Sequence, residues 1–499
     1  MPDYFIGVDS GTQSTKAIIM DGETGEIKGK STRTYELIRG LSPGHMEQHP
    51  EIWIRETLAV IREALSQSKI DSDCVKAIGV SGQQHGFVPL DTNGRVIRPA
   101  KLWNDTSTAE ECDIIMEAIG GFEKTIQLVG NPILPGYTAP KILWMKRNEP
   151  ENYKRLSTVL LPHDYINYML TGVIAMEYGD ASGTILMDVK SRSWCDEVIN
   201  AIDPELKVKL PPLHSSDKPV GFLSEKAAHS LGLSTDVLIS AGGGDNMMAA
   251  IGTGNTSSGR VTVSLGTSGT IYAFSDKPII DPLGEVAAFC DSTNHWLPMI
   301  CTMNVTVATE IVRTLFNQNY ELLEKYLIDG PLGSGGILFL PYLTGERTPN
   351  MPNSTGVLIG LNNVNYNEIN ITKATVEGVT LGLNYGLNRM RELGIDPSEV
   401  RLTGGGSKNH AWTKICADIF DVEIVGFKES EGAALGAAIQ SLWCYGNQIS
   451  STEPIAVIAD KFVELDESTR LRPNIDNVKK YKSLQKRHDS LRNTLFNNH

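Results

Sequence analysis

Two polar stretches in this 499-residue chain share one pattern that suits the binding of an anion. Residues 7–19 read GVDSGTQSTKAII and residues 262–273 read TVSLGTSGTIYA, so each places a Gly-Thr turn between apolar residues. Backbone N–H groups in such a turn point the same way and attract an anion. We expect Gly11, Gly266 and Gly269 to take left-handed backbone conformations there. Two facing turns predict a chain of phosphates as the ligand, and therefore a nucleoside triphosphate.

Asp245 follows an apolar stretch and three glycines, in TDVLISAGGGDN. The glycines leave room for a substrate to lie against the backbone. The alternative is an ordinary aspartate that caps a turn or a helix. The glycine run favours a binding site.

Gln84 and His85 stand between two glycines, in CVKAIGVSGQQHG, where we expect an apolar strand to end. Amide and imidazole groups at such a tip suit hydrogen bonds to several hydroxyls, although a single histidine is more often structural. Trp103, Asn104 and Asp105 form a second polar group of this kind. Its tryptophan either packs on a sugar face or belongs to the core.

Two further glycine-rich stretches have the composition of phosphate-binding loops. Residues 25–31, GEIKGKS, are one residue short of a P-loop and lie in a predicted hairpin rather than between a strand and a helix. Residues 404–407, GGGS, follow a predicted strand and open a helix, for which we expect Ser407 to be the N-cap. They lack the third glycine of a dinucleotide-binding fingerprint, but they suit a nucleotide seated at a helix N-terminus.

The elements that must position these groups alternate between strands and helices. Residues 4–28 predict two strands around the first turn, a second turn at residues 22–25 and the start of a third strand; residues 50–67 predict a helix. Helices are also expected at residues 370–393, where glycines every fourth residue indicate close packing on one face, and at 474–496. The pattern predicts an α/β fold with mixed sheets.

The repeated turn indicates an internal duplication, with a second domain that restarts the pattern of the first. A chain of this length exceeds one usual hydrophobic core. We therefore expect two domains, residues 1–247 and 248–499, with the ligand cleft between them. Closure of that cleft would keep water from a bound triphosphate.

Composition excludes several classes of function. The net charge of −14 argues against nucleic acid and anionic membranes as partners. The seven cysteines are scattered and form no C-x-x-C pair, which argues against a zinc site and fits a reducing compartment. No signal peptide or membrane-spanning run is recognisable, so we expect a cytoplasmic protein.

Several motifs in order resemble those of the FGGY carbohydrate kinases, within the superfamily of actin, sugar kinases and heat-shock ATPases. They are GYTAPKILWMKRNEP (136–150), GGGDN (242–246), SLGTSG (264–269), LPYLTGERTP (340–349) and LTGGGSKN (402–409). The stretches GQQHG, LWND and LLPHDYINYMLTG are similar to those of the branch that phosphorylates xylulose. The resemblance covers residues 4 to about 446 and implies a two-domain, actin-like (ribonuclease H-like) fold.

The resemblance also implies a role for each matching residue. Asp245 would be the general base that accepts the proton of the attacking sugar hydroxyl, and Asp9 with Asp245 would lie at Mg²⁺. Asp9 and Lys16 keep a second interpretation each, a hairpin aspartate bound to backbone amides and a solvent-facing lysine. ATP would be held by Gly11, Thr12, Gln13, Ser14, Lys16, Gly266, Thr267, Ser268, Gly405, Gly406 and Asn409. The sugar would be held by Gln84, His85, Trp103, Asn104, Asp105 and Asn246.

The implied reaction is phosphorylation of a five-carbon ketose by ATP, D-xylulose above all. Ribulose, gluconate and glycerol stay open as substrates, and Gln84 stands where many bacterial relatives carry methionine. A chaperone-like or filament ATPase would share the two turns but would not need the polar groups at residues 84–85 and 103–105. A sugar sensor would not need Asp245. We expect slow ATP hydrolysis without sugar; the sequence does not decide between a monomer and a homodimer.

Overall fold

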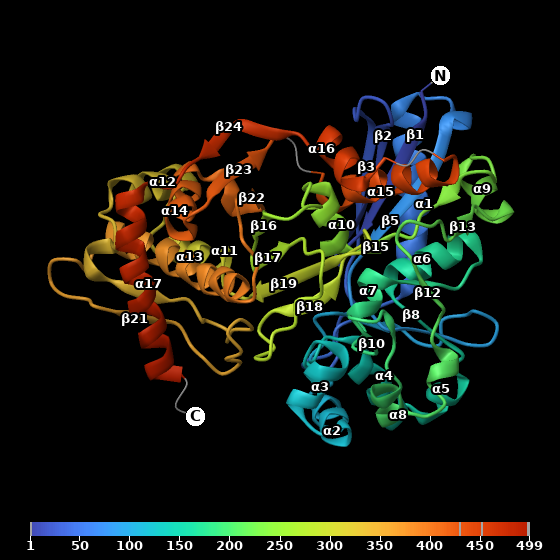
Figure 1. Cartoon of the computed structure of the whole chain (residues 1–499), viewed down its shortest axis with the longest axis horizontal. Coiled ribbons are helices and arrows are strands. Elements are labelled where there is room, and N and C mark those ends of the chain that lie inside the picture. Colours follow the sequence, from blue (N-terminus) through green and yellow to red (C-terminus); the bar gives the residue numbers. More distant parts are fainter. Residues whose placement is uncertain (1, 429–430, 451–452, 497–499) are drawn as a thin grey trace.

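The computed structural model describes residues 2–428, 431–450 and 453–496, and the chain forms two lobes (Figure 1). Each lobe is built on a seven-stranded sheet. The first sheet has the order β13-β14-β5-β1-β2-β3, with β15 also paired to β5, and the second has the order β18-β19-β17-β16-β22-β23-β24. Both sheets mix parallel and antiparallel pairs, so the expected α/β class is confirmed.

The first sheet opens with the predicted hairpin. Its strands are β1 (Tyr4–Ser10), β2 (Ser14–Asp21), β3 (Ile27–Thr34), β5 (Val75–Gly82), β13 (Gly221–Phe222), β14 (Leu238–Ile239) and β15 (Gly243–Gly244). Successive side chains of a strand point to opposite faces. Ile6 and Val8 of β1 therefore pack in one core with Trp53, whereas Phe5 packs on the other face with Ala434. Burial on both faces explains why the strand reads as a continuous apolar run.

The second sheet repeats this arrangement. Its strands are β16 (Arg260–Leu265), β17 (Gly269–Ala273), β18 (Ala287–Cys290), β19 (Trp296–Thr302), β22 (Glu399–Thr403), β23 (Glu423–Phe427) and β24 (Leu465–Leu471). β16 pairs antiparallel with β17 and parallel with β22, as β1 does with β2 and β5. The duplication inferred from the two turns is thus a duplication of strand pairing.

Helices cover both sheets, and short ribbons join the remaining segments. The helices are α1 (Pro50–Ser68), α2 (Ala109–Ile119), α3 (Phe122–Val129), α4 (Thr138–Asn148), α5 (Pro150–Arg155), α6 (Pro162–Thr171), α7 (Tyr178–Ser182), α8 (Asp196–Ile202), α9 (Glu225–Leu231), α10 (Asp245–Gly252), α11 (Thr306–Leu315), α12 (Tyr320–Asp329), α13 (Glu368–Glu392), α14 (His410–Phe420), α15 (Gly432–Gln448), α16 (Ile455–Phe462) and α17 (Ile475–Phe496). The 3₁₀ turns are η1 (Ser72–Cys74), η2 (Lys207–Lys209), η3 (Ser334–Gly336) and η4 (Gly405–Lys408). Two-stranded ribbons pair β4 (Glu47–Gln48) with β7 (Ala100–Lys101), β6 (Val88–Leu90) with β8 (Thr158–Leu160), β9 (Met176–Glu177) with β12 (Leu213–His214), β10 (Met187–Asp188) with β11 (Ser193–Trp194), and β20 (Leu338–Leu340) with β21 (Val357–Ile359).

Helix α15 comes from the C-terminal part of the chain but lies against β1 and β5 of the first sheet (Figure 1). The approach is close because Gly7 and Gly79 have no side chain: a Cβ at either position would overlap the backbone of Ala434 or Ala437. The division at residues 247/248 stays a prediction about the chain. The packing of α15 shows that segments on either side of this division share one core.

The long helix α13 confirms the element expected at residues 370–393. Two of its three glycines serve close packing, since a Cβ at Gly378 would overlap Phe339 and one at Gly386 would lie 2.9 Å from Ile300; a Cβ at Gly382 would meet Pro341 at an ordinary 3.6 Å. The N-cap prediction for Ser407 is wrong. Asn409 caps α14 by accepting from the N–H of Trp412, while Ser407 lies inside the preceding turn, where its hydroxyl bonds the carbonyl of Gly404.

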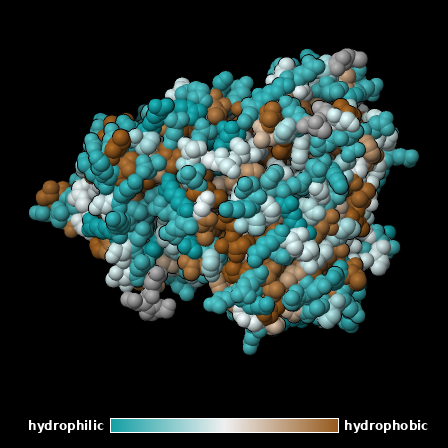
Figure 2. All heavy atoms as spheres, viewed as in Figure 1, coloured by the Kyte–Doolittle hydropathy of each residue, from teal (hydrophilic) through white to brown (hydrophobic). Residues whose placement is uncertain are grey.

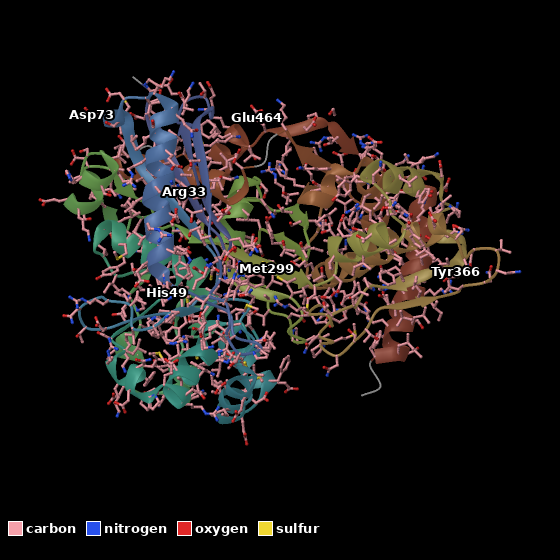
Figure 3. All side chains as sticks on the ribbon, turned by 180° about the vertical axis from the view of Figure 1, so that it is seen from behind. Arg33, His49, Asp73, Met299, Tyr366 and Glu464 are labelled. Carbon is pink, nitrogen blue, oxygen red and sulfur yellow. The ribbon has the colours of Figure 1, made fainter. Side chains whose placement is uncertain are left out.

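The two lobes meet along a buried apolar cluster. Met247 of α10 packs there with Tyr272, Phe289 and Met299 of the second sheet. Figure 3 shows Met299 where the lobes join, with Arg33 and Tyr366 farther out on either side. On the face in Figure 2, hydrophobic residues are interspersed among hydrophilic ones, and none of the described helices is long and apolar enough to cross a bilayer.

Candidate active site

Strand register brings Asp9 and Asp245 to one edge of the first sheet. Asp9 lies opposite Ser81 across the parallel pair β1–β5, and Gly243 lies opposite the same serine across β15–β5. Neighbouring strands are about 4.8 Å apart, so Asp9 and Gly243 are separated by roughly 10 Å. Helix α10 begins immediately afterwards at Asp245. The carboxyl ends of three strands thus gather both acidic residues at the junction of the lobes.

Asp245 has the electrostatics of a poised base. Burial raises the pKa of its carboxyl to about 7, and the negative charges of Asp9 and Asp180 add to the rise. Its Oδ1 accepts from the backbone N–H of Asn246 at 2.8 Å and from the Asn246 side-chain amide at 3.0 Å. Gly244 is the N-cap of α10, so Asp245 does not act as the ordinary helix cap that was the alternative interpretation.

Asp9 is the second carboxylate at this edge. Burial raises its pKa, while a hydrogen bond from the Ser81 hydroxyl (3.0 Å) and the charge of Lys16 act in the opposite direction. Its partner is therefore a side chain, whereas the alternative interpretation expected backbone amides. A pair of neighbouring carboxylates, both destabilised as anions by burial, is a donor set that suits a divalent cation.

Gln84 and Asn246 form one hydrogen-bonded unit beside Asp245. The Asn246 amide donates to Oε1 of Gln84 at 2.7 Å, and the Gln84 amide donates to the sulfur of Met247 at 3.1 Å. Gln84 is buried, and a Cβ at Gly244 would lie 2.6 Å from its side chain. The structure thus joins the tip of β5 to the start of α10, two segments more than 150 residues apart.

His85 adopts the left-handed conformation, with φ 63°, immediately after this unit. Its ring lies 4.9 Å from that of Tyr137 and 5.7 Å from that of Phe289, centroid to centroid. Burial lowers its pKa to about 3, and the charges of Lys141 and Arg347 act in the same direction, so the imidazole is neutral. Its Nδ1 lies against Gly183, where an added Cβ would come within 2.3 Å of it, and a hydrogen bond from the Gly183 backbone opposes the fall in its pKa. A neutral imidazole has one N–H donor and one acceptor nitrogen, which suits a hydroxyl ligand.

Lys141 explains how His85 keeps this conformation. The side chain is fully buried, and its ammonium donates to the backbone carbonyls of His85 (2.7 Å) and Gly136 (2.6 Å). Burial lowers its pKa to about 7. The lysine comes from the GYTAPK motif, whose sequence by itself does not reveal this carbonyl-binding role.

The predicted group Trp103-Asn104-Asp105 separates in the structure. Trp103 is 37% exposed and its indole N–H donates to the hydroxyl of Thr12 at 2.9 Å, so it touches the first turn. The Oδ1 of Asn104 is buried, and no described group bonds it. Asp105 is fully buried; it accepts from the Lys101 ammonium (3.0 Å) and from Met46 and Ser107. Its oxygens are already engaged, which argues against the predicted contact with sugar.

The Lys101 ammonium also lies in a cluster of His45, Glu47 and Asp105. Carboxylate and imidazole atoms of His45, Glu47 and Asp105 lie within 4.8 Å of one another, as metal ligands would. The Lys101 Nζ lies 3.2 Å from Nδ1 of His45, 3.5 Å from Glu47 and 3.0 Å from Asp105. A lysine already supplies the positive charge here, so the cluster has a structural role.

The first turn, residues 11–14, is held by side chains. The Tyr35 hydroxyl donates to the carbonyl of Gly11 and the Gln48 amide to that of Thr12, both at 2.7 Å. The Thr12 hydroxyl donates to Gln83 at 3.1 Å, and Gln13 is exposed. The Gly11 N–H is used by Ser14 O at 2.9 Å, so the turn offers fewer free amides than its sequence suggested.

Lys16 lies on the strand after this turn, and its ammonium binds Glu431 at 2.8 Å. Glu431 also bonds Lys30 at 3.3 Å and directly precedes α15. The lysine is therefore neither free in solvent nor free toward a phosphate here. Its predicted contact with phosphate stays a prediction that would require this ion pair to open.

The second turn, residues 266–268, is held by backbone. The carbonyls of Gly266 and Thr267 accept from the N–H groups of Thr306 (2.9 Å) and Val305 (3.1 Å) at the start of α11. Thr267 and Ser268 are exposed. The expectation of left-handed glycines is wrong in both turns: Gly11, Gly266 and Gly269 all have ordinary backbone angles. Gly269 is instead required by crowding, since a Cβ would lie within 2.8 Å of Leu383 and Val305.

The glycine run 404–406 lies directly behind the second turn. A Cβ at Gly404 would lie 2.7 Å from the backbone of Leu265, and one at Gly406 would lie 2.9 Å from the Leu265 side chain. Gly405 is exposed and has open space where its Cβ would be. Asn409 is half-buried beside this run, and its side-chain Oδ1 caps α14 by accepting from the N–H of Trp412. The structure therefore groups Gly266, Gly405, Gly406 and Asn409.

Glu346 and Arg347 lie between residues that contact the two turns. The sequence analysis assigned them no role. Glu346 is buried and accepts from the N–H of Met303 (2.7 Å), two residues before the Val305 amide that binds Thr267. The Arg347 guanidinium lies 6.0 Å from the centre of the Trp103 ring. Both residues lie in the stretch LPYLTGERTP, which supported the family resemblance without indicating a role for either residue.

Comparison with known proteins decides the family. Residues 4–252 match the N-terminal domain, and residues 261–445 the C-terminal domain, of the FGGY family of carbohydrate kinases. The chain belongs to the FGGY family of carbohydrate kinases. It is 40% identical to a xylulose kinase of Haemophilus influenzae over 97% of this chain and 98% of that one, and 35% identical to a xylulose kinase of Bacillus subtilis over 96% and 95%.

Solved structures confirm the expected actin-like architecture. A crystal structure of a xyloylose kinase from Brucella ovis superposes with a TM-score of 0.91 and 30% identity over 99% of both chains. A gluconate kinase from Lactobacillus acidophilus also superposes with a TM-score of 0.91, at 25% identity over 99% of this chain and 98% of that one. These FGGY kinases share the fold while their named substrates differ, so the fold alone does not select the sugar.

Proposed function

We propose that this FGGY carbohydrate kinase transfers the γ-phosphoryl group of ATP to a ketopentose, D-xylulose first among the candidates, and releases D-xylulose 5-phosphate. The observation that carries the proposal is the position of Asp245, beside the Gln84–Asn246 unit and in the electrostatic reach of Asp9. The xylulose kinases among its relatives, similar over almost the whole chain, favour the ketopentose.

The residues at the junction support an in-line transfer. The Asp245 carboxylate accepts the proton of the attacking sugar hydroxyl, and Gln84 and Asn246 keep that carboxylate and the sugar in register. The transition state of phosphoryl transfer is loose, so the carboxylate mainly orients the hydroxyl and takes its proton late. The two turns hold the phosphates, with Gly405, Gly406 and Asn409 beside the adenosine.

Mg²⁺ fits this site as the ion that accompanies the nucleotide. Asp9 supplies an oxygen-donor carboxylate whose only described side-chain partner is the Ser81 hydroxyl, and hard cations prefer such ligands. Asp9, with Asp245 close to it, would hold the ion. When bound, Mg²⁺ would neutralise charge on the phosphates during transfer.

The first experiment is a coupled ADP-release assay with D-xylulose, D-ribulose, gluconate and glycerol. We expect D-xylulose to give the highest kcat/KM and ATP hydrolysis without sugar to be slow. A higher kcat/KM with gluconate or glycerol would contradict the substrate assignment, and rapid hydrolysis without sugar would contradict the kinase mechanism. Mass spectrometry of the product identifies the phosphorylated sugar.

A second candidate, gluconate, has one observation in its favour, the equal TM-score to a gluconate kinase. A carboxylated sugar would need a cation facing the sugar subsite, and the assay above separates the two substrates. A cytoplasmic location, proposed from the scattered cysteines, is a secondary part of this assignment.

A further inference from the structure

Arg347 stands out among the charged groups around the junction because no described residue forms a hydrogen bond or ion pair with its guanidinium. The neighbouring cations are engaged: Lys16 binds Glu431, Lys101 binds Asp105, and Lys141 binds two carbonyls. Arg347 itself is exposed. A guanidinium carries five N–H donors in a planar fork, and those of Arg347 are available to a ligand.

The backbone beneath this side chain is fixed. The carboxylate of Glu346, which is 3% exposed, accepts from the N–H groups of Met303 (2.7 Å) and Arg347 (2.8 Å) and from the Asn304 amide (3.3 Å). Thr348 bonds the carbonyl of Glu285 at 3.2 Å. The loop that carries Arg347 is therefore anchored on both sides, while no described residue forms a hydrogen bond or ion pair with its guanidinium.

The charge of Arg347 acts on residues from both lobes at their junction. It lowers the pKa of His85, after burial and Lys141, and it opposes the burial-driven rise in the pKa of Tyr137 and of Cys301. Its guanidinium also lies 6.0 Å from the Trp103 ring. Two of these four residues, His85 and Trp103, are predicted sugar ligands on the first lobe, while Arg347 comes from the second half of the chain.

The opposite wall of the subsite has few free donors. The Asn246 amide donates to Gln84 and Asp245, the Gln84 amide donates one N–H to Met247, and neutral His85 has a single N–H. A ketose presents a carbonyl and several hydroxyls, which need donors as well as acceptors. Arg347 offers further donors from the second lobe.

We propose that Arg347 is a specificity-determining residue that donates hydrogen bonds to sugar oxygens from the second lobe. The inference rests on the proposed sugar kinase function. It makes the sugar subsite complete only when both lobes contribute, since Asp245, Gln84 and His85 form one wall and Arg347 the other. A sugar so bound links the lobes through Arg347.

The test compares wild type with Arg347→Met and Arg347→Lys by steady-state kinetics. A hydrogen bond from a charged donor contributes about 1.5–3 kcal/mol, equivalent to roughly 10- to 150-fold in binding. We expect the KM for D-xylulose to rise about 10- to 100-fold in Arg347→Met, with partial rescue in Arg347→Lys, and the KM for ATP to change by less than about twofold. Arg472→Met is the control for removal of a surface guanidinium far from the proposed subsite: Arg472 directly follows β24, is 85% exposed and pairs with Glu423 at 3.0 Å.

A second readout separates sugar contact from a structural role. D-xylulose, xylitol and 1-deoxy-D-xylulose differ at single oxygen-bearing groups, and we expect at least one ratio of their kcat/KM values to collapse toward unity in Arg347→Met. A uniform loss for all three compounds, an equal rise in the KM for ATP, or an unchanged KM for sugar would overturn the inference. Thermal unfolding establishes that each variant is folded.

The experiment also separates this inference from the proposed function. Wild-type turnover alone decides whether D-xylulose is the substrate. If wild type prefers another sugar of the panel, the proposed substrate falls, and the ratio of variant to wild type is measured with that sugar instead. If calorimetry detects no binding of any panel sugar to wild type, both proposals fall together.

Discussion

The two Gly-Thr turns have the same strand pairing but different supports. Side chains from distant segments hold the first: Tyr35, Gln48 and Trp103 bond its backbone or its threonine. Backbone amides at the start of α11 hold the second, and its threonine and serine are exposed. A duplicated motif therefore conserves a backbone path, while each copy acquires its own network around that path.

The copies also differ in charge. When Gly11 is aligned with Gly266, Asp9 corresponds to Ser264, and their neighbours across the parallel pair are Ser81 and Thr403. Only the first copy brings a carboxylate to the junction. Under the proposed function, the proton acceptor therefore belongs to the first lobe, and the second turn would offer neutral groups to the phosphates.

The largest expected effect comes from removing the Asp245 carboxylate, the proposed general base. Asp245→Asn should lower kcat about 10²- to 10⁴-fold, the usual contribution of a general base, because the amide cannot accept the proton. Sugar affinity measured by calorimetry should change by only a few-fold. Turnover close to wild type in the coupled assay would remove Asp245 from its proposed role and leave the turns without a common centre.

A reciprocal exchange between the turns should have a smaller effect, on stability. Gly269 corresponds to Ser14, so Gly269→Ser gives the second turn the residue of the first. Its Cβ would lie 2.7 Å from the Thr302 hydroxyl and 2.8 Å from Leu383 and Val305. Crowding of this kind costs typically about 1–3 kcal/mol, and we expect that loss in the free energy of unfolding.

The matched variant is Ser14→Gly, which crowds nothing and should cost only about 0.5–1 kcal/mol, because glycine loses more backbone freedom on folding. Urea denaturation of both variants measures the difference. Equal losses would show that the two turns are packed alike, contrary to the contacts described above.

The smallest expected effect concerns the charge that only the first copy carries. With the pKa of Asp245 near 7 in the free enzyme, kcat/KM should rise with pH up to about 7 and then level, since the base works only when deprotonated. Asp9→Asn removes a neighbouring negative charge, so the Asp245 pKa should fall and the acidic limb should move by about one pH unit to lower pH.

The direction of the shift separates this electrostatic effect from the loss of an Mg²⁺ ligand. Loss of the ion lowers the height of the profile and, because a nearby cation favours the Asp245 anion, moves the midpoint to higher pH. Ser264→Ala, the corresponding change in the second copy, should leave the midpoint where it is. A midpoint shift in Ser264→Ala as large as that in Asp9→Asn would contradict the assignment of charge to one copy.

Much of the fold could be predicted from local pattern. The hairpin of residues 4–21, helix α1 and helix α13 follow from apolar periodicity and from residues that break it, and these signals lie within one element. The internal duplication was inferred from the alignment of the two turns. The position of α15 on the first sheet could not be predicted, because the complementary glycines Gly7 and Gly79 are remote in sequence from Ala434 and Ala437.

The candidate site was predictable where a residue type and a strand end coincide, as at Asp9, Gln84 and Asp245. The site was not predictable where a side chain forms an ion pair with a residue that the sequence analysis did not consider. Asp105 is engaged by Lys101, and Lys16 by Glu431. Neither ion pair produces a periodic pattern in the sequence. Arg347 was noted only as part of a stretch that resembles the family.

The placement of α15 bears on how such a molecule can be divided. A fragment that ends near residue 247 would present Gly7 and Gly79 as a bare groove on its sheet, and the complementary alanines would remain on the other piece. Neither piece could bury this face of the first sheet by itself, so we expect complete folding of the first lobe to need the chain through α15.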